Sequence, residues 1–423
     1  MRKALLSLTA LLLVLLLVAC GSSEEGGSES SESDADTGGG ESITLAVWGS
    51  SPAETNALEQ TVASFEEAKG IDVEIEVIQD NFQDALTARF AANNAPDVFY
   101  LESYVAPRFI ESGVLADISN DVPEQDDFYQ PLLDSFRDEE GNLYAVPKDY
   151  STLATYVNED LLTEAGYTLD DIPSDWEGLL GFAEELQTKL DDDQAAMIFD
   201  ATMARHLSSF LATGLDPVAE DGKADFTSSE DTLAYLQSII DGQDEGYLKN
   251  PMIDLGIDSA GAAFGTNKAV IMIEGNWVLS ALNQEYPDVS YKVLPAPTVN
   301  GEKQSMTFNV GYAIAKDTEN KEAAVEFVNY MTGEGQQQWS ELSGTLPTRM
   351  SVAEAMDLYE NEDLAPHVEA AEYGTVWSSG VTLPVISNAF DNYFSAALNG
   401  DMTIEEAMQM AEDEANAEIE RQQ

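Results

Sequence analysis

Three short segments of the chain combine an aromatic side chain with carboxylate, amide or hydroxyl groups. They are Trp48-Gly49-Ser50-Ser51, Glu102-Ser103-Tyr104 and Glu274-Gly275-Asn276-Trp277. Flat apolar rings beside hydrogen-bonding groups are the side chains that hold a small polar molecule in a cleft that excludes water. We therefore expect these three segments to contribute to a binding site.

The residue patterns that usually signal catalysis are missing from the sequence. His206 and His367 have no histidine or cysteine at metal-ligand spacing, and Cys20 is the only cysteine. The chain contains no Gly-x-Ser-x-Gly turn and no glycine-rich phosphate loop. A glycosidase needs only two carboxylates at a fixed separation, and among 79 acidic residues the sequence neither supports nor excludes such a pair. We expect a protein that is not an enzyme and needs no cofactor or metal, with a secreted glycosidase-like enzyme as a distant alternative.

Alternating strands and helices are predicted around these segments. Residues 43–47 and 71–77 alternate as strands, residues 97–101 predict a third strand, and apolar side chains at helical spacing follow the first two. Ser51-Pro52-Ala53-Glu54 is typical of a helix start, with a capping serine and proline in the first turn. The pattern predicts an α/β fold with a mostly parallel sheet, in which ligands bind beyond the carboxyl ends of the strands.

The first 42 residues predict export and attachment to a membrane. Arg2 and Lys3 precede an apolar run that is shorter than the roughly 20 residues of a spanning helix. The run ends in Leu17-Val18-Ala19-Cys20, which resembles a bacterial lipobox, so we expect residues 1–20 to be a lipoprotein signal peptide with the lipid on Cys20. Residues 21–42 contain only Gly, Ser, Thr, Ala and acids, a composition that predicts a disordered acidic tether.

The charge of the chain is strongly negative. Its 79 Asp and Glu face only 18 Lys and Arg, for a net charge of −61. We therefore expect no nucleic-acid partner, because its phosphates would be repelled. The simplest interpretation is a halophilic acidic surface whose repulsion is screened by salt. The alternative, an acidic surface that binds cations, stays open, although the sequence contains no Asp-x-Asp-x-Asp-Gly calcium loop.

A series of short motifs, in order along most of residues 43–415, resembles the extracellular solute-binding proteins of sugar ABC transporters, the group that includes maltose-binding protein. The motifs that carry this resemblance are Phe65-Glu66-Glu67, Ala95-Pro96-Asp97-Val98, Gly113-Val114-Leu115-Ala116-Asp117-Ile118, Gly141-Asn142-Leu143-Tyr144-Ala145-Val146-Pro147, Tyr156-Val157-Asn158-Glu159-Asp160-Leu161-Leu162, Asp175-Trp176-Glu177, Gly265-Thr266-Asn267-Lys268-Ala269-Val270 through Trp277, Val310-Gly311-Tyr312-Ala313-Ile314 and Gly344-Thr345-Leu346-Pro347-Thr348-Arg349.

The resemblance implies a two-lobed periplasmic-binding-protein fold, with a sheet and flanking helices in each lobe and several chain crossings that act as a hinge. The crossings are expected near residues 151–155, 293–297 and 331–336. Lobe one would then hold residues 43–151 and 297–333, and lobe two residues 152–294 and 334–423.

The resemblance also implies a cleft between the lobes that binds a sugar or oligosaccharide. The side chains expected to line the cleft are aromatic, acidic, amide or basic residues near strand ends and crossings: Trp48, Glu102, Tyr104, Asp149, Tyr150, Arg205, Glu274, Asn276, Trp277, Asn309, Tyr312 and Trp377. Trp176 and Trp339 are expected in the core instead.

The expected role is that of an extracytoplasmic, lipid-anchored monomer that closes on its ligand and docks on the membrane permease of an ABC importer. The acid excess keeps a second binding protein of the same fold open, one for a polyamine or another cationic solute. The aromatic residues and the motifs favour the sugar. A surface adhesin is disfavoured, because hinge-like crossings would have no purpose in it.

Overall fold

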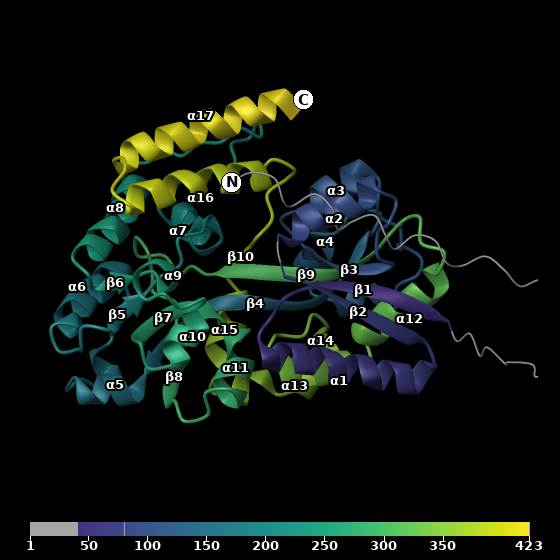
Figure 1. Cartoon of the computed structure of the whole chain (residues 1–423), viewed down its shortest axis with the longest axis horizontal. Helices are drawn as coiled ribbons and strands as arrows, with labels where there is room; N and C mark the ends of the chain where they lie inside the picture. Colours follow the sequence, from purple (N-terminus) through teal and green to yellow (C-terminus); the bar gives the residue numbers. More distant parts are fainter. Residues whose placement is uncertain (1–40, 80, 423) are drawn as a thin grey trace, which may run out of the picture. The chain divides into compact units, whose positions relative to one another are not determined.

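The computed structural model describes residues 41–79 and 81–422, which lie within one compact unit (Figure 1). Its strands are β1 (Ser42–Trp48), β2 (Asp72–Ile78), β3 (Val98–Glu102), β4 (Ala145–Asn158), β5 (Ala195–Ile198), β6 (Leu248–Lys249), β7 (Ala269–Gly275), β8 (Tyr291–Pro295), β9 (Met306–Ile314) and β10 (Thr375–Val376). Its helices are α1 (Pro52–Lys69), α2 (Phe82–Ala91), α3 (Ala106–Ser112), α4 (Gln130–Asp134), α5 (Glu159–Glu164), α6 (Trp176–Gln187), α7 (Leu207–Ala212), α8 (Glu230–Asp244), α9 (Pro251–Asp254), α10 (Ala260–Gly265), α11 (Val278–Gln284), α12 (Lys321–Met331), α13 (Gln336–Ser343), α14 (Met350–Ala355), α15 (Ala365–Ala371), α16 (Leu383–Leu398) and α17 (Ile404–Gln422). The predicted α/β class is confirmed.

The first elements form for the reasons that the sequence indicates. Ile43, Leu45 and Val47 alternate along β1 and are buried. The Ser51 hydroxyl accepts a hydrogen bond from the Glu54 backbone N–H at 3.2 Å and so caps α1. The helix ends at Gly70, whose φ of 72° is a left-handed conformation that favours glycine. The turn between β1 and α1 is therefore fixed, and Trp48 lies at its start.

The sheet is parallel at its two ends and antiparallel in the middle. Its strand order is β2-β1-β3-β9-β4-β7-β5-β6, with β10 beside β9 and β8 beside β4. β1 is parallel to β2 and β3, and β5 is parallel to β6 and β7. β9 is antiparallel to β3 and β4, and β4 is antiparallel to β7. The prediction of a mostly parallel sheet therefore holds for the outer strands, while the long central strands β4 and β9 run in opposite directions.

Strand β4 connects two separate hydrophobic cores. Its residues 145–152 pair with β9, whereas residues 153–158 pair with β7 and β8. The N-core, around Phe65, Phe99 and Phe327, contains Val146, whereas the C-core, around Phe210 and Phe390, contains Leu153. The change of partner after Thr152 falls within the first predicted crossing.

The cores also indicate where the chain passes between them again. Val299 and Met306 belong to the C-core, while Val310 packs against the N-core, so the second passage lies within β9, later than the predicted residues 293–297. Trp339 still belongs to the N-core and Leu346 to a third cluster that joins β4, β7 and α15. The lobe boundaries given above remain a proposal, and these cores place both later passages further along the chain.

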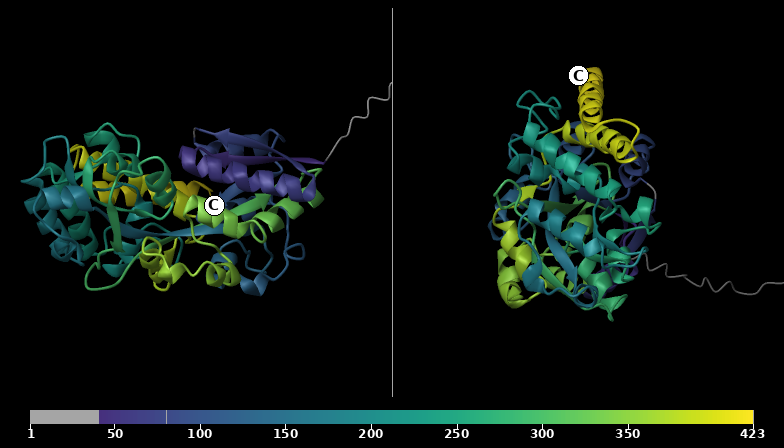
Figure 2. Two further views of the ribbon diagram at one scale, coloured as in Figure 1. Left: turned by 90° about the horizontal axis from the view of Figure 1, so that it is seen from below. Right: turned by 90° about the vertical axis from the view of Figure 1, so that its left-hand side faces the viewer.

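The C-terminal helices cover the C-core. α16 packs along α17 and both contact α8, which can be followed in the yellow and teal ribbons of Figure 2. Phe390 and Phe394 of α16 and Met408 of α17 are buried there. Asp391, the neighbour of Phe390, faces a cavity instead. α16 thus brings a carboxylate to the same site as residues nearly 300 positions earlier.

Candidate ligand-binding site

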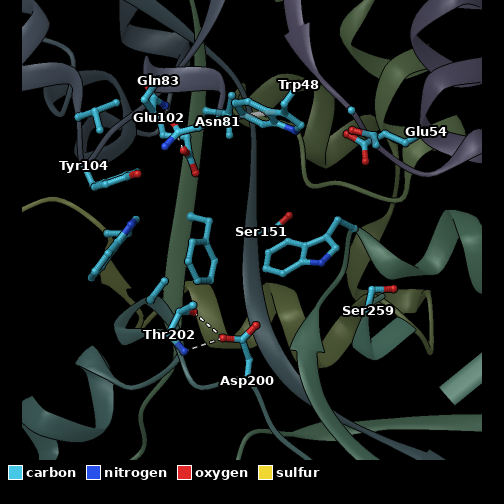
Figure 3. Close-up of a pocket in the computed structure, with 18 of the residues that line it drawn as sticks. Trp48, Glu54, Asn81, Gln83, Glu102, Tyr104, Ser151, Asp200, Thr202 and Ser259 are labelled. Atoms are coloured by element: carbon cyan, nitrogen blue, oxygen red, sulfur yellow. Dashed lines mark hydrogen bonds between the residues drawn. The ribbon is translucent and has the colours of Figure 1, made fainter. Parts of the chain in front are cut away.

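A cavity of about 1390 Å³ lies beyond the carboxyl ends of β1, β3 and β7. Figure 3 shows Trp48, Gln83 and Glu102 on one side of it and Asp200 and Thr202 on the other. Residues from elements of both the N-core and the C-core line it. Eight of the twelve predicted site residues are among them: Trp48, Glu102, Tyr104, Asp149, Arg205, Glu274, Trp277 and Trp377.

The other four predicted residues do not line this cavity. The Asn276 side chain accepts a bond from the Thr152 N–H at 3.1 Å and donates to the Gly344 carbonyl at 2.9 Å. Asn309 donates to the Leu132 carbonyl at 2.8 Å. Tyr312 is buried in the N-core, and Tyr150 in the third cluster. In this structure these four side chains hold neighbouring segments together.

An ion pair stacked on aromatic rings forms the C-core side of the cavity. Arg205 Nη2 donates to Glu274 Oε1 at 2.9 Å, and the guanidinium lies 5.1 Å from the Trp277 ring centroid. Phe308 meets Trp277 edge to face, with ring centroids 5.2 Å apart. Burial raises the pKa of Glu274, and the charge of Arg205 opposes that shift. The pair orients Trp277, which stays partly exposed.

Tyr104 and Trp377 form a second aromatic wall. Their ring centroids are 5.5 Å apart with an angle of 34° between the planes. The Ser103 hydroxyl donates to the Trp377 carbonyl at 2.8 Å and so links the end of β3 to the segment after β10. Glu102, one residue earlier, faces Gln83 Nε2 at 3.5 Å. Burial raises the pKa of Glu102 to about 7.

A buried lysine and aspartate lie at the base of the cavity, on β4. Lys148 Nζ pairs with Asp149 Oδ2 and lies 4.2 Å from the Trp339 ring centroid. Trp339 Nε1 donates to the same carboxylate at 2.6 Å, and Thr345 Oγ1 donates at 3.3 Å. The Asp149 Oδ2 atom thus joins α13 to β4, and Trp339 is a core residue as predicted.

Trp48 completes the wall on the N-core side. Its ring meets Tyr100 at a centroid distance of 4.8 Å and Phe82 at 5.6 Å, both edge to face. These contacts fix the ring, which keeps part of its surface open to the cavity. Glu54 from the first turn of α1 lines the cavity nearby, and burial raises its pKa while Lys148 opposes the shift.

The lining residues that were not predicted include Glu54, Lys148, Asp200, Phe308 and Asp391. Lys148 could have been predicted from the sequence, because it is one of few basic residues and lies beside the predicted Asp149. Asp200 accepts bonds from the Thr202 N–H at 2.7 Å and hydroxyl at 2.5 Å (Figure 3). Burial acts against ionisation of Asp200, yet the nearby Arg205 charge and these bonds lower its pKa. Asp391 lies within a helix and carried no local signal.

Within residues 41–79 and 81–422, no cluster of three or more His, Cys, Asp or Glu has the geometry to hold a metal ion. Both histidines are buried and hydrogen-bonded: His206 Nδ1 is 2.9 Å from the Tyr235 hydroxyl, and His367 Nε2 is 2.7 Å from the Tyr156 hydroxyl. Burial lowers the pKa of His367 to about 3. None of the helices in the described part of the chain is long and apolar enough to span a membrane.

The family follows from comparison with known proteins. The model of the bacterial extracellular solute-binding protein family matches residues 60–366, which is most of the chain. The chain therefore belongs to this family of binding proteins, whose members act outside the cytoplasm. The predicted family and the prediction of a binding protein are confirmed.

Individual relatives are distant in sequence but similar over nearly their whole length. The diacetylchitobiose-binding protein DasA of Streptomyces coelicolor is 22% identical over 414 residues, covering 93% of this chain and 94% of DasA. The substrate-binding protein Lmo0181 of Listeria monocytogenes, solved with cycloalternan, has a TM-score of 0.80 and 23% identity over 90% of this chain and 99% of its own. A solute-binding protein of Thermotoga lettingae, solved with α-D-tagatose, has a TM-score of 0.79 and 21% identity over 89% and 99%. The two structures show that the chain shares this fold.

Proposed function

We propose that this protein binds an oligosaccharide in the cavity and delivers it to the membrane permease of an ABC importer. The observation that carries the proposal is the arrangement of Trp48, Trp277 and the Tyr104–Trp377 pair around one cavity, interleaved with buried polar groups. Sugar rings present C–H faces that pack on flat aromatic surfaces, and hydroxyls that need both donors and acceptors.

The size of the cavity favours a ligand of more than one ring. Its volume of about 1390 Å³ exceeds the roughly 300–1,000 Å³ of a typical small-molecule pocket. The aromatic residues line opposite walls, so that separate rings of one ligand can contact each of them. Two of the relatives named above, DasA and Lmo0181, are described with diacetylchitobiose and cycloalternan as ligands.

Closure around the ligand accounts for delivery. Glu102 and Tyr104 follow a strand of the N-core half, while Glu274 and Trp277 follow a strand of the C-core half. A ligand that contacts both groups stabilises the closed form in proportion to its differential affinity for that form. The strands that connect the halves, β4 and β9, would serve as the hinge.

We further propose that a lipid on Cys20 anchors the protein outside the cytoplasm and that it acts as a monomer. Residues 1–40, which contain the signal peptide, Cys20 and most of the tether, lie outside the described residues. The proposal rests on the sequence Leu17-Val18-Ala19-Cys20. A Cys20→Ser protein should lose its membrane association; wild-type behaviour in detergent partitioning would contradict the anchor.

A polyamine fits the site less well than a sugar. Glu274 and Asp149 are already paired with Arg205 and Lys148, which leaves carboxylates without an ion pair, such as Glu102 and Asp391, only in other parts of the lining. The aromatic walls would also bury more apolar surface than a linear polyamine offers.

A thermal-shift screen of oligosaccharides, monosaccharides and polyamines in molar salt tests the function. A ligand at one hundred times its Kd stabilises the folded state by about 2.7 kcal/mol, which is visible as a rise in Tm. We expect at least one oligosaccharide to raise Tm more than any monosaccharide. Stabilisation by polyamines alone would contradict the proposal.

A further inference from the structure

Two carboxylates at one end of the cavity, like several others that line it, form no ion pair, although the charge of Arg205 acts on Glu102 and opposes the rise of its pKa. Glu102 lies at the end of β3 and Asp391 within α16, and neither forms an ion pair in the described residues. Asp391 Oδ1 accepts the Met203 N–H at 2.7 Å, which leaves the second carboxylate oxygen available. Glu102 faces only the weak contact from Gln83 Nε2 at 3.5 Å.

Both carboxylates line the same cavity as the Tyr104–Trp377 wall. Burial raises the pKa of the Tyr104 hydroxyl, and the charges of Glu102 and Asp391 act in the same direction. The Tyr104 ring packs on Trp377 at 5.5 Å, and Figure 3 shows Glu102 and Tyr104 on the same side of the cavity. Gln83 Oε1, beside Glu102, is buried without a hydrogen-bond partner among the described residues. This end of the cavity therefore combines aromatic faces, an unpaired acceptor and two carboxylates that form no ion pair.

That combination matches one chemical group. An ammonium has three N–H donors and no acceptor, and it is attracted both to carboxylates and to the face of an aromatic ring. A hydroxyl would use the acceptors but would leave two buried charges uncompensated. An acetamide carries one N–H donor and a carbonyl, which would meet the carboxylates as a further acceptor.

We propose that this end of the cavity, formed by Glu102, Asp391, Tyr104 and Trp377, binds a protonated amino group on a sugar ring. The ligand would then be an oligosaccharide that contains a free amino sugar. The inference rests on the proposed function, because it assigns the substrate class of the same cavity.

The acidity of the two side chains is consistent with this assignment. Burial raises the pKa of Glu102 to about 7 and that of Asp391 to about 7. Ionising them is therefore unfavourable without a ligand, and a cation between them would relieve that cost. At the other end of the cavity, Arg205 already pairs with the Glu274 carboxylate.

Calorimetry with glucosamine oligomers and N-acetylglucosamine oligomers of equal length tests the inference. We expect the free amine to bind at least ten-fold more tightly than its acetylated counterpart. Glu102→Gln and Asp391→Asn, which keep the side-chain shape, should each reduce this preference to below about three-fold. Glu111→Gln removes one exposed charge outside the cavity lining and should leave the preference unchanged. Melting temperatures recorded alongside confirm that each variant is folded.

The outcomes separate this inference from the proposed function. Equal or tighter binding of the acetylated oligomer, or a preference that survives in both variants, overturns the amino-sugar assignment and leaves the oligosaccharide function in place. Binding only of a neutral oligosaccharide such as a glucose oligomer does the same. If no oligosaccharide of any kind binds, the proposed function fails and the inference fails with it.

Discussion

The two ends of the cavity differ in how their acidic side chains are paired. At the Trp277 end, Glu274 is 4% exposed and bonded to Arg205, which itself packs on Trp277. At the Tyr104 end, Glu102 and Asp391 line the cavity together with the Tyr104–Trp377 pair and form no ion pair among the described residues, although the Arg205 charge opposes the rise in the pKa of Glu102. At the Trp277 end, the charge of Glu274 is paired without a ligand, and the ion pair holds the Trp277 ring in place. The Tyr104 end is electrostatically incomplete, which is the condition under which a bound cation gains most.

Removing the cation from the Trp277 end should produce the largest loss of stability. Arg205→Met leaves Glu274 buried without its partner, and breaking a buried pair in this way costs about 3–5 kcal/mol. Because the Arg205 side chain is 20% exposed, we expect a loss of about 2–4 kcal/mol in urea denaturation at pH 7. The double variant Arg205→Met/Glu274→Gln should recover most of this. A double variant as unstable as the single one would show that the guanidinium acts through packing alone.

Neutralising Glu102 at the Tyr104 end should raise the stability of the folded protein instead of lowering it. Burial raises the pKa of Glu102 to about 7 in the folded protein, so its ionisation disfavours folding once the pH exceeds the pKa of the unfolded chain. The penalty is absent below the unfolded pKa of about 4.3, grows as pH rises towards 7, and is complete above it. Glu102→Gln should therefore stabilise the ligand-free protein by about 1–2 kcal/mol at pH 8, after allowance for partial exposure, and by almost nothing at pH 4. A loss of stability at pH 8 would mean that the Glu102 carboxylate has a partner in the free protein.

Salt should affect the exposed acidic residues more strongly than the buried Arg205–Glu274 pair. Between 0.1 and 1 M salt the Debye length falls from about 10 Å to about 3 Å, so repulsion among the exposed acids is relieved. We expect the Tm of the wild type to rise with sodium chloride but not with an uncharged osmolyte. The stability difference caused by Arg205→Met should change by less than about 1 kcal/mol, because buried pairs are screened much less. A flat response of the wild type would contradict the halophilic interpretation.

The sequence predicted residues that line the cavity where strand ends determine their position. Trp48, Glu102 and Trp277 follow strands whose carboxyl ends meet, so the α/β pattern was enough to bring them together. It located residues poorly where the direction of a side chain decides. Asn309 and Tyr312 lie on β9 at the right place in the sheet, but their side chains face the α4 region and the N-core.

Other residues could not be found from local patterns. Asp391 reaches the cavity because α16 packs against the C-core, a tertiary contact that leaves no mark in the surrounding sequence. Asn276 lies between Glu274 and Trp277, and yet its side chain turns to bridge Thr152 and Gly344. The later passages between the cores lie further along the chain than the proposed crossings for a similar reason, since β9 begins in one core and ends in the other.

Calorimetry of Trp277→Ala, with the first oligosaccharide that the screen identifies, tests whether a sugar ring packs on Trp277 in this cavity. Loss of the buried aromatic surface should weaken binding by about 30- to 1,000-fold, equivalent to roughly 2–4 kcal/mol, and Trp277→Phe should retain part of the affinity. Unchanged affinity together with a large fall in Tm would show that Trp277 only packs the fold, and would contradict the account.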